Sequence, residues 1–358
     1  GKDYKKPASI QQQRLMSQLI ANEMKSGAFG LSSGLEYDPG FYSTLPELIT
    51  SAKAAAKYHG IYTSHMRNED NHFFDAFKEL VTISREAHLP AQISHIKLGS
   101  KAVWNKAGEV IKSIENARKR GNDVTADIYP YTFWQSSITV LIPTRDWNDR
   151  SLWKAGLEDI GGADHVLLST YSPNKEWEHK TIQQISQETG RDPITVIQDI
   201  VQKTHVPEGS GRESVVVTAM LEEDLITFLK YSNTMICSDG MPGGTHPRAA
   251  GSFPRIIARY VNELKSLSLT DAVRKMTSLP AKRLGLSDRG ILKQGMKADI
   301  LLFDHKSVKD NATIDHPTAL AEGMQYVFVN GSIVINNGSL TDQRPGHMLR
   351  HVSLKSKG

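Results

Sequence analysis

The sequence predicts an α/β protein in which parallel βα units are followed by a smaller β-rich part. From about residue 10 to residue 130, short strand-like runs alternate with amphipathic helical segments, as in parallel βα folds. Successive strand-like runs begin about 30 residues apart, the length of one βα unit. Beyond about residue 288 the pattern changes to short β segments with glycine turns. These observations fit either a βα barrel or a doubly wound sheet, with a β-rich appendage.

Strands and helices alternate regularly in the first part of the chain. Four runs rich in apolar and β-branched residues are expected to form strands, at 28–32, 60–65, 91–96 and 123–129. Apolar residues at helical spacing predict helices at 9–26, 46–58, 73–87 and 107–120. This order of elements is that of consecutive parallel βα modules.

The rhythm loosens after residue 129. Strand-like runs at 165–170 and 214–220 flank a helical region at 180–205, and a further strand-like run at 233–240 carries an acidic residue, Asp239, next to its last position. A helix is expected at 269–284, followed by β segments within 290–304 and 326–340.

Composition excludes several classes of function. The 358 residues are 39% hydrophobic and 23% charged, and the formal net charge of +4 comes from charges spread along the chain. This is not the basic patch of a nucleic-acid-binding protein. No apolar run is as long as the roughly 20 residues of a membrane span, and no signal segment opens the chain, which favours a cytoplasmic location. The single cysteine, Cys237, excludes an internal disulfide.

Three strand-like runs end at a residue that can bind a metal or act as a base. His65 and His95 each follow a serine on neighbouring βα units, and Asp239 ends a later run. The carboxyl ends of barrel strands form the active-site face, and two imidazoles with a carboxylate are ligands typical of a hydrolytic zinc site. Either histidine alone is more often a hydrogen-bonded core residue, and Asp-Gly is also a common turn. The repetition favours the zinc site.

Other polar residues near these runs are candidates for substrate binding. Lys97 would project on the same side of a continuing strand as His95, where it could bind a carboxylate or be a solvated rim residue. Arg67 and Glu69 are expected to form rim or second-sphere contacts. The glycine-rich stretch 30–40 lacks the spacing of a nucleotide-binding loop.

Aromatic and guanidinium side chains extend this candidate set. Tyr129 and Tyr131 could donate hydrogen bonds to a carboxylate, although aromatic packing is the commoner role. Arg248 and Arg255 could clamp a carboxylate, and one of the two is expected to be structural. No base is identifiable beside Cys237, so we expect it to pack rather than to react.

With these residues assembled, the sequence resembles the N-acyl-D-amino-acid deacylases, or D-aminoacylases, of the amidohydrolase superfamily. The matching segments are GAFGLSSGLEYDPGFYS, SHMRNE, QISHIK, DVTADIYPYT, SDGMPGGTHPR, GSFPR, KADILLFD and VFVNGSIVINNGSL. The first, the second and the SDGMP segment together are specific to this branch. The KADILLFD type of ending occurs across amidohydrolases.

The resemblance implies a (β/α)8 TIM-type barrel beside a small β-sandwich, with residues 1–287 as a partial barrel and 288–358 as the β-sandwich part. It implies a zinc-activated water that attacks the amide of a small N-acyl-D-amino acid. By motif matching, His65 and His95 resemble the histidine ligands after the fifth and sixth strands. Asp239 resembles the aspartate that contacts the metal-bound water and relays its proton to the leaving amine. The residues matching the substrate pocket are Lys97, Tyr129, Ser136 and Arg248.

The chain departs from the family pattern at its N-terminal side. The family places a His-x-His pair on its first strand and a metal-binding cysteine on an early strand, and neither occurs in this sequence. We therefore expect a C-terminal portion of a deacylase, with exposed sheet edges and little or no activity alone.

Two other functions stay open at this stage. A cyclic-amide hydrolase of the dihydroorotase or hydantoinase type would share the barrel, but it usually carries a carboxylated lysine on the fourth strand, and no lysine follows AFGLSSGL. Alternatively, the chain is a catalytically inactive barrel remnant that acts as a binding module.

Overall fold

A five-stranded parallel sheet forms the centre of the protein in the computed structural model, which describes residues 4–206 and 211–351. Its strand order is β1-β2-β3-β4-β9, and all neighbours pair in parallel. The strands span Gly30–Gly34, Ile61–His65, Ala91–Ile93, Val124–Ile128 and Thr234–Ile236. Within the described residues, β1 and β9 each pair on one side only, so the sheet is an open arc.

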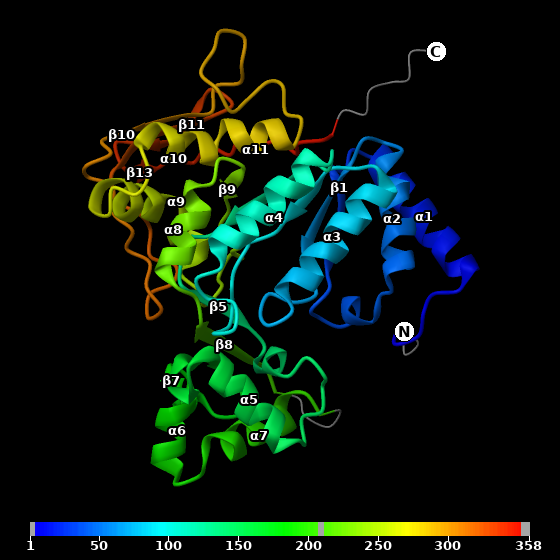
Figure 1. The fold of residues 1–358 in the computed structure, drawn as a ribbon. Helices are drawn as coiled ribbons and strands as arrows, with labels where there is room; N and C mark the ends of the chain where they lie inside the picture. The colour runs from blue at the N-terminus through cyan, green and yellow to red at the C-terminus, as the bar shows by residue number, and fades with distance from the viewer. Residues whose placement is uncertain (1–3, 207–210, 352–358) are drawn as a thin grey trace.

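Amphipathic helices cover the outer face of this sheet (Figure 1). They are α1 (Ile10–Lys25), α2 (Leu45–Ala56), α3 (Phe73–Ala87), α4 (Ala107–Lys119) and α8 (Glu222–Lys230). The four predicted N-terminal helices are confirmed to within two residues. Thr44 and Glu47 form a capping box that starts α2, and Pro46 occupies its first turn, where the missing N–H leaves no hydrogen bond unmade.

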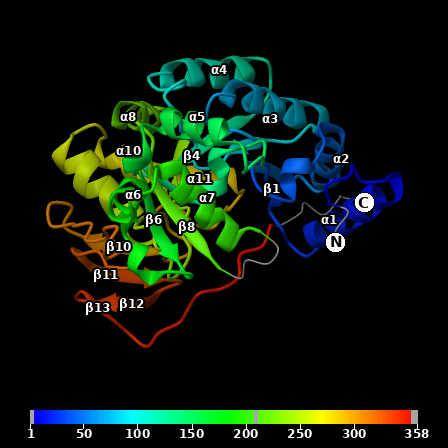
Figure 2. The same cartoon turned by 90° about the horizontal axis from the view of Figure 1, so that it is seen from below.

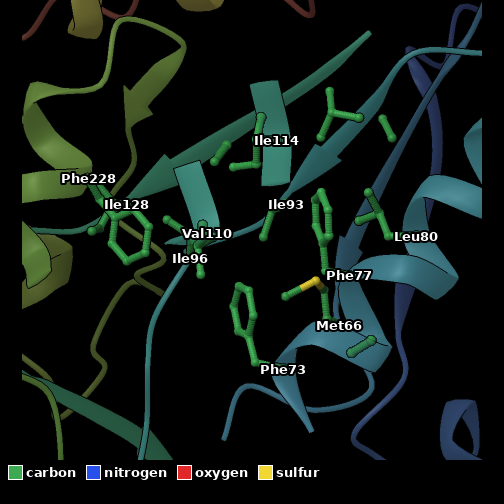
Figure 3. Packing of buried hydrophobic residues seen from close by; sticks show 14 of the residues in the cluster. Met66, Phe73, Phe77, Leu80, Ile93, Ile96, Val110, Ile114, Ile128 and Phe228 are labelled. Carbon is green, nitrogen blue, oxygen red and sulfur yellow. The ribbon is translucent and has the colours of Figure 1, made fainter. Parts of the chain in front are cut away.

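The main core lies between the sheet and these helices (Figure 3). Phe73, Phe77 and Leu80 of α3 pack toward Ile93 of β3, and all four are buried. This apolar stripe arises from the i, i+4, i+7 spacing of the α3 residues. The packing fixes the strands whose carboxyl ends carry the candidate site.

Residues 133–206 and 211–218 fold into a separate layer, which we call the insertion. Its antiparallel sheet has the order β5-β8-β6-β7, with strands Phe133–Ser136, Glu213–Thr218, Val166–Tyr171 and Lys180–Thr181. Its helices are α5 (Arg150–Ile160), α6 (Ile182–Thr189) and α7 (Pro193–Thr204), with 3-10 turns at Ile138–Leu141, Ala163–His165 and Lys175–Trp177. Buried Trp153 lies in a core of its own.

The insertion agrees only in part with the sequence-based expectation. The strands expected near 165–170 and 214–220 are present, but they pair antiparallel with each other. The helical region at 180–205 is two helices, because Gly190 takes a left-handed conformation that ends α6. In Figure 1 the insertion, drawn in green, lies on one side of the parallel sheet, and the C-terminal β part lies on the other.

Helices and a second antiparallel sheet complete the chain. After β9 come α9 (Arg248–Arg255), a π-helical turn (Ile256–Glu263), α10 (Leu269–Met276) and α11 (Ser278–Arg283). The sheet β10-β11-β12-β13 follows, at Ile300–Phe303, Met324–Val329, Ser332–Asn336 and Ser339–Leu340. The helix predicted at 269–284 is interrupted at Thr277, and the segment 290–304 is a strand only at its end.

The end of the described chain returns to the parallel sheet. Figure 2 shows this segment running from β13 toward the β1 side of the molecule. There, the backbone N–H of His351 donates to the carbonyl of Gly27 at 2.9 Å. No helix among the described residues has both the length and the apolar character needed to cross a bilayer.

Candidate metal and substrate site

Two histidines meet at the carboxyl ends of neighbouring strands. His65 is the last residue of β2, and His95 lies two residues after β3. Nδ1 of His65 and Nε2 of His95 are 3.0 Å apart. The structure thus brings together the two side chains that the repeated Ser-His pattern singled out.

The local backbone explains this proximity. The N–H of Ser94 donates to the carbonyl of Ser64 at 3.0 Å, which keeps the two strand ends in register. His95 then adopts a left-handed conformation with φ of 37°. The carboxylate of Asp127, on β4, accepts the N–H of His95 at 2.7 Å and thereby stabilises this uncommon conformation. For this reason β3 ends at Ile93 and does not reach residue 96 as expected.

The outer nitrogens of both rings contact charged groups. Nε2 of His65 is 2.8 Å from Oε2 of Glu36. Nδ1 of His95 is 2.7 Å from Nζ of Lys97 and 3.2 Å from Oε1 of Glu69. Metal-binding histidines commonly have one ring nitrogen held by a carboxylate in this way, which fixes the ring and leaves the other nitrogen for the metal.

Glu69 and Lys97 form a buried ion pair beside the histidines, with 7% and 6% of their side chains exposed. Burial alone would raise the pKa of Glu69, but His65, Lys97 and His95 together hold it well below its usual range. Burial alone would lower the pKa of Lys97, yet Glu69 raises it above its usual value. Both groups are therefore charged at neutral pH.

The donor set fits a zinc ion held by two histidines. Two nitrogens bound to one tetrahedral zinc at about 2.05 Å each would be about 3.3 Å apart, close to the observed 3.0 Å. Oε1 of Glu69 is buried without a hydrogen-bond partner in the structure. When Nε2 of His95 binds a metal, Nδ1 must carry the proton, so Nδ1 would exchange the hydrogen bond that it accepts from Lys97 for one that it donates to this oxygen. The Glu69 side of the rings is a poor metal position because Lys97 already lies there.

Asp239 lies in the same cavity but is not part of the histidine cluster. Its Oδ2 pairs with Nη1 of Arg248 at 2.7 Å. Among the described residues, one group of side chains has its potential metal-ligand atoms within 4.8 Å of one another: His65, Glu69 and His95. That Asp239 binds a metal therefore stays a prediction.

Arg248 is placed by neighbouring rings. Its guanidinium lies 4.8 Å from the centre of the Tyr129 ring, and the backbone N–H of Arg248 donates to Nδ1 of buried His246 at 3.0 Å. Nε2 of His246 donates to the carbonyl of Phe133 at 3.0 Å. Burial and Arg248 lower the pKa of His246 to about 3, so this ring is neutral.

The remaining predicted pocket residues have different surroundings. The hydroxyl of Tyr129 is buried without a partner, and burial raises its pKa. Oγ of Ser136 donates to the hydroxyl of Tyr37 at 3.4 Å. Lys97 does reach His95, although the strand does not continue between them. A turn brings the two side chains together.

One cavity of about 320 Å³ lies between the sheet and the insertion, and both contribute to its wall. Among the predicted pocket residues, Lys97, Ser136 and Arg248 line it, whereas Tyr129 lies behind Arg248 and is not part of the wall. His65, His95, Lys97, Asp239 and Arg248 line it from the sheet side. From the insertion come Trp134, Gln135, Ser136, Val140, Leu141, Gly156, Asp159 and Ile160. The cavity therefore requires that the two layers be docked.

Several sequence candidates have structural contacts outside this cavity. Tyr131 donates to Asp310 at 3.2 Å, and Arg255 pairs with the same carboxylate at 3.3 Å. Arg67 pairs with Glu79 at 2.9 Å. Burial and neighbouring Asp127 raise the pKa of Cys237 well above its usual value, as expected of a packed thiol.

The sequence did not identify Glu36 and Asp127 as site residues, and it left Glu69 between a rim ion pair and a contact behind the metal ligands; the structure places Glu69 against His95 and Lys97. Glu69 had a signal, since it lies four residues after His65. Asp127 lies at the end of a predicted strand beside the strand of His95. Glu36 had no local signal, because its contact with His65 depends on the loop after β1.

Comparison with known proteins identifies the family. A model of the amidohydrolase family matches residues 234–335. The chain is 34% identical over 344 residues to an N-acyl-D-glutamate deacylase of Alcaligenes xylosoxydans xylosoxydans, covering 96% of this chain and 65% of that protein. The chain thus spans about two thirds of the length of this curated relative.

Solved structures agree. A D-aminoacylase structure that defines a subset of amidohydrolases is 31% identical, with a TM-score of 0.83 over 98% of this chain and 68% of that one. An N-acyl-D-glutamate deacylase of Bordetella bronchiseptica, complexed with zinc and a phosphonate mimic of the tetrahedral intermediate, is also 31% identical. Its TM-score is 0.84, with 98% of this chain and 68% of that one covered. The open parallel sheet is thus part of a TIM-type amidohydrolase barrel, and the chain belongs to the D-aminoacylase family of the amidohydrolases.

Proposed function

We propose that this chain acts in the zinc-dependent hydrolysis of N-acyl-D-amino acids, which yields a carboxylate and a D-amino acid. The observation that carries the proposal is the arrangement of the two histidines. Nδ1 of His65 and Nε2 of His95 face each other at 3.0 Å, while Glu36 and Glu69 contact the outer nitrogens. The solved relative that contains zinc and a tetrahedral-intermediate mimic supports the choice of metal and reaction.

The chemistry that zinc supplies when bound is polarisation of the amide carbonyl and activation of a water. His65 and His95 would hold the ion. Glu36 holds His65 in the tautomer that binding requires, and Glu69 would do the same for His95 once Lys97 no longer donates to its Nδ1. Asp239, which lines the same cavity, would accept a proton and pass it to the leaving amine. Its pairing with Arg248 at 2.7 Å holds the carboxylate in place at the wall of the cavity.

The substrate carboxylate would lie near Arg248 and Tyr129. The Tyr129 hydroxyl is buried and has no partner, so a bound carboxylate would satisfy it. Arg248 provides a planar cation beside the same ring. Lys97 and Ser136 line the cavity together with Arg248, and we assign these three residues and Tyr129 to carboxylate recognition.

Metal analysis together with an enantiomer comparison tests the proposal. The chain should bind about one zinc, and His65→Ala or His95→Ala should remove it, whereas exposed His347→Ala should not. Hydrolysis, where present, should favour N-acetyl-D-amino acids over their L enantiomers and over a hydantoin. A folded chain that binds no zinc would support an inactive binding module, and preferred opening of the cyclic amide would refute the linear-amide substrate.

Two further expectations from the sequence stay predictions. A domain boundary at residue 288 would be tested by limited proteolysis, which should cut between α11 and β10. The cytoplasmic location would be tested by cell fractionation.

A further inference from the structure

The loop after β1 holds two side chains against His65. Glu36 contacts Nε2 of His65 at 2.8 Å. The ring of Tyr37 lies 4.6 Å from the His65 ring, centre to centre. We call residues 36–43 the β1 loop. Its position determines whether the carboxylate that orients His65 is in place.

From the sheet side, Arg67 binds the backbone of this loop. It donates to the carbonyls of Phe41 and Ser43 at 2.7 and 2.9 Å, and it is itself held by Glu79. This arrangement fixes the far end of the β1 loop but leaves the end that carries Glu36 without support from Arg67.

The second arginine, Arg145, comes from the insertion and binds the other end. Its Nη2 donates to the carbonyl of Glu36 at 2.7 Å, and its Nε donates to Oδ1 of Asp38 at 3.1 Å. Its guanidinium lies 3.6 Å from the centre of the Phe41 ring. One planar group thus makes a backbone hydrogen bond, an ion pair and a stacking contact, a combination that lysine cannot reproduce.

We propose that Arg145 is a positioning residue that couples docking of the insertion to the orientation of His65. Arg145 holds the backbone of Glu36, and the Glu36 side chain in turn holds Nε2 of His65. The effect passes through the β1 loop, because Arg145 itself is absent from the cavity lining. The inference rests on the proposed function only in identifying His65 as a metal ligand.

Cobalt(II) binding to the 358-residue chain, followed by its visible absorption, tests this coupling. Loss of a group that orients a metal-binding histidine typically weakens metal affinity about 10- to 100-fold. We therefore expect Arg145→Ala to weaken cobalt binding about 10-fold and Arg145→Lys to recover only part of the loss. The matched control is Arg150→Ala, which removes an insertion arginine that pairs with Asp192 at 2.6 Å.

A double variant separates positioning from a general loss of structure. In a Glu36→Ala background, Arg145→Ala should change cobalt affinity less than about 2-fold, because the group it positions is already absent. An equal loss in both backgrounds, or a loss no larger than that of Arg150→Ala, would overturn the proposal.

Hydrogen exchange supplies a measurement that needs no metal. The amide of Phe41, whose ring lies against Arg145, donates to the carbonyl of Tyr37. Arg145→Ala should speed exchange of this amide about 10-fold, while the Ser43 amide at the end held by Arg67 and the amides of α3 stay protected. If that variant fails to fold, Asp38→Ala removes the side-chain acceptor of Arg145 Nε and provides the second test. Unchanged exchange in Asp38→Ala would then refute the role of Arg145. If no cobalt binds at all, the proposed function fails, and the exchange result still decides this inference.

Discussion

Removing one partner of the buried Glu69–Lys97 ion pair should destabilise the protein strongly. Only 7% and 6% of these side chains are exposed, so each single substitution leaves an uncompensated charge away from water. Breaking such a pair typically costs about 3–5 kcal/mol. For Lys97→Met we expect the lower end, about 3 kcal/mol, because His95 still lies 3.2 Å from Glu69 and can stabilise the carboxylate.

The assay is urea unfolding of the metal-free chain at pH 7.5, followed by circular dichroism. The double variant Glu69→Gln/Lys97→Met should lose less stability than the sum of the single variants, by about 2 kcal/mol. A matched control is Lys309→Met, which removes a pair with Glu322 at 3.0 Å whose side chains are 67% and 57% exposed. That variant should change stability by less than about 1 kcal/mol.

Salt provides a second discrimination. Raising sodium chloride from 0.15 M to about 1 M shortens the screening length to about 3 Å and weakens exposed pairs more than buried ones. The loss in Lys97→Met should therefore persist at high salt. Additive single variants, or a loss in Lys97→Met as small as that in Lys309→Met, would refute the view that the pair is desolvated.

Three further predictions concern positions around the site. Asp127→Ala should lower the free energy of unfolding by about 1–3 kcal/mol, because the N–H of His95 loses its acceptor. The same variant should weaken zinc binding in a chelator competition. Asp127→Asn retains the acceptor and should have a smaller effect on both. Burial lowers the pKa of Lys275 from 10.5 to about 8 in the folded protein. Between pH 8 and pH 10.5 the unfolded state therefore binds more protons than the folded state, and the free energy of unfolding rises with pH. Urea unfolding should show this rise, by up to about 3 kcal/mol relative to Lys275→Met. Gly30→Ala would place its β-carbon 2.0 Å from a backbone oxygen of β2, so it should lower the free energy of unfolding by about 3 kcal/mol. In the control Gly34→Ala the nearest contact of the new β-carbon is at 3.5 Å, so the loss of unfolding free energy should be smaller.

Local patterns were sufficient to predict the parallel part of the fold. Strands β1, β2 and β4 and helices α1 to α4 lie where apolar periodicity and the regular spacing placed them. His65 and His95 could be expected to meet because the carboxyl ends of neighbouring parallel strands lie at one edge. Their 3.0 Å separation confirms that expectation.

Non-local contacts explain what the sequence did not predict. Strands β6 and β8 are about 45 residues apart in the chain, and periodicity does not specify that they pair antiparallel in a separate sheet. The contacts of Glu36 and Asp127 with the histidines likewise depend on backbone turns that bring distant segments together. Sequence patterns therefore predicted the histidine pair but not the groups that orient it.

The site depends on two layers that each have their own core. The parallel sheet supplies His65 and His95, whereas the insertion supplies much of the cavity wall and the arginine that holds the Glu36 backbone. The insertion core around Trp153 is separate from the core under the sheet, and a smaller cluster packs Phe133 and Trp134 of the insertion against Tyr129 and Tyr131. A change in how the insertion docks would leave both histidines on their strands but would release the β1 loop and open the cavity. Changes in how the insertion docks should therefore have a large effect on metal affinity and substrate binding and a smaller effect on the stability of the sheet.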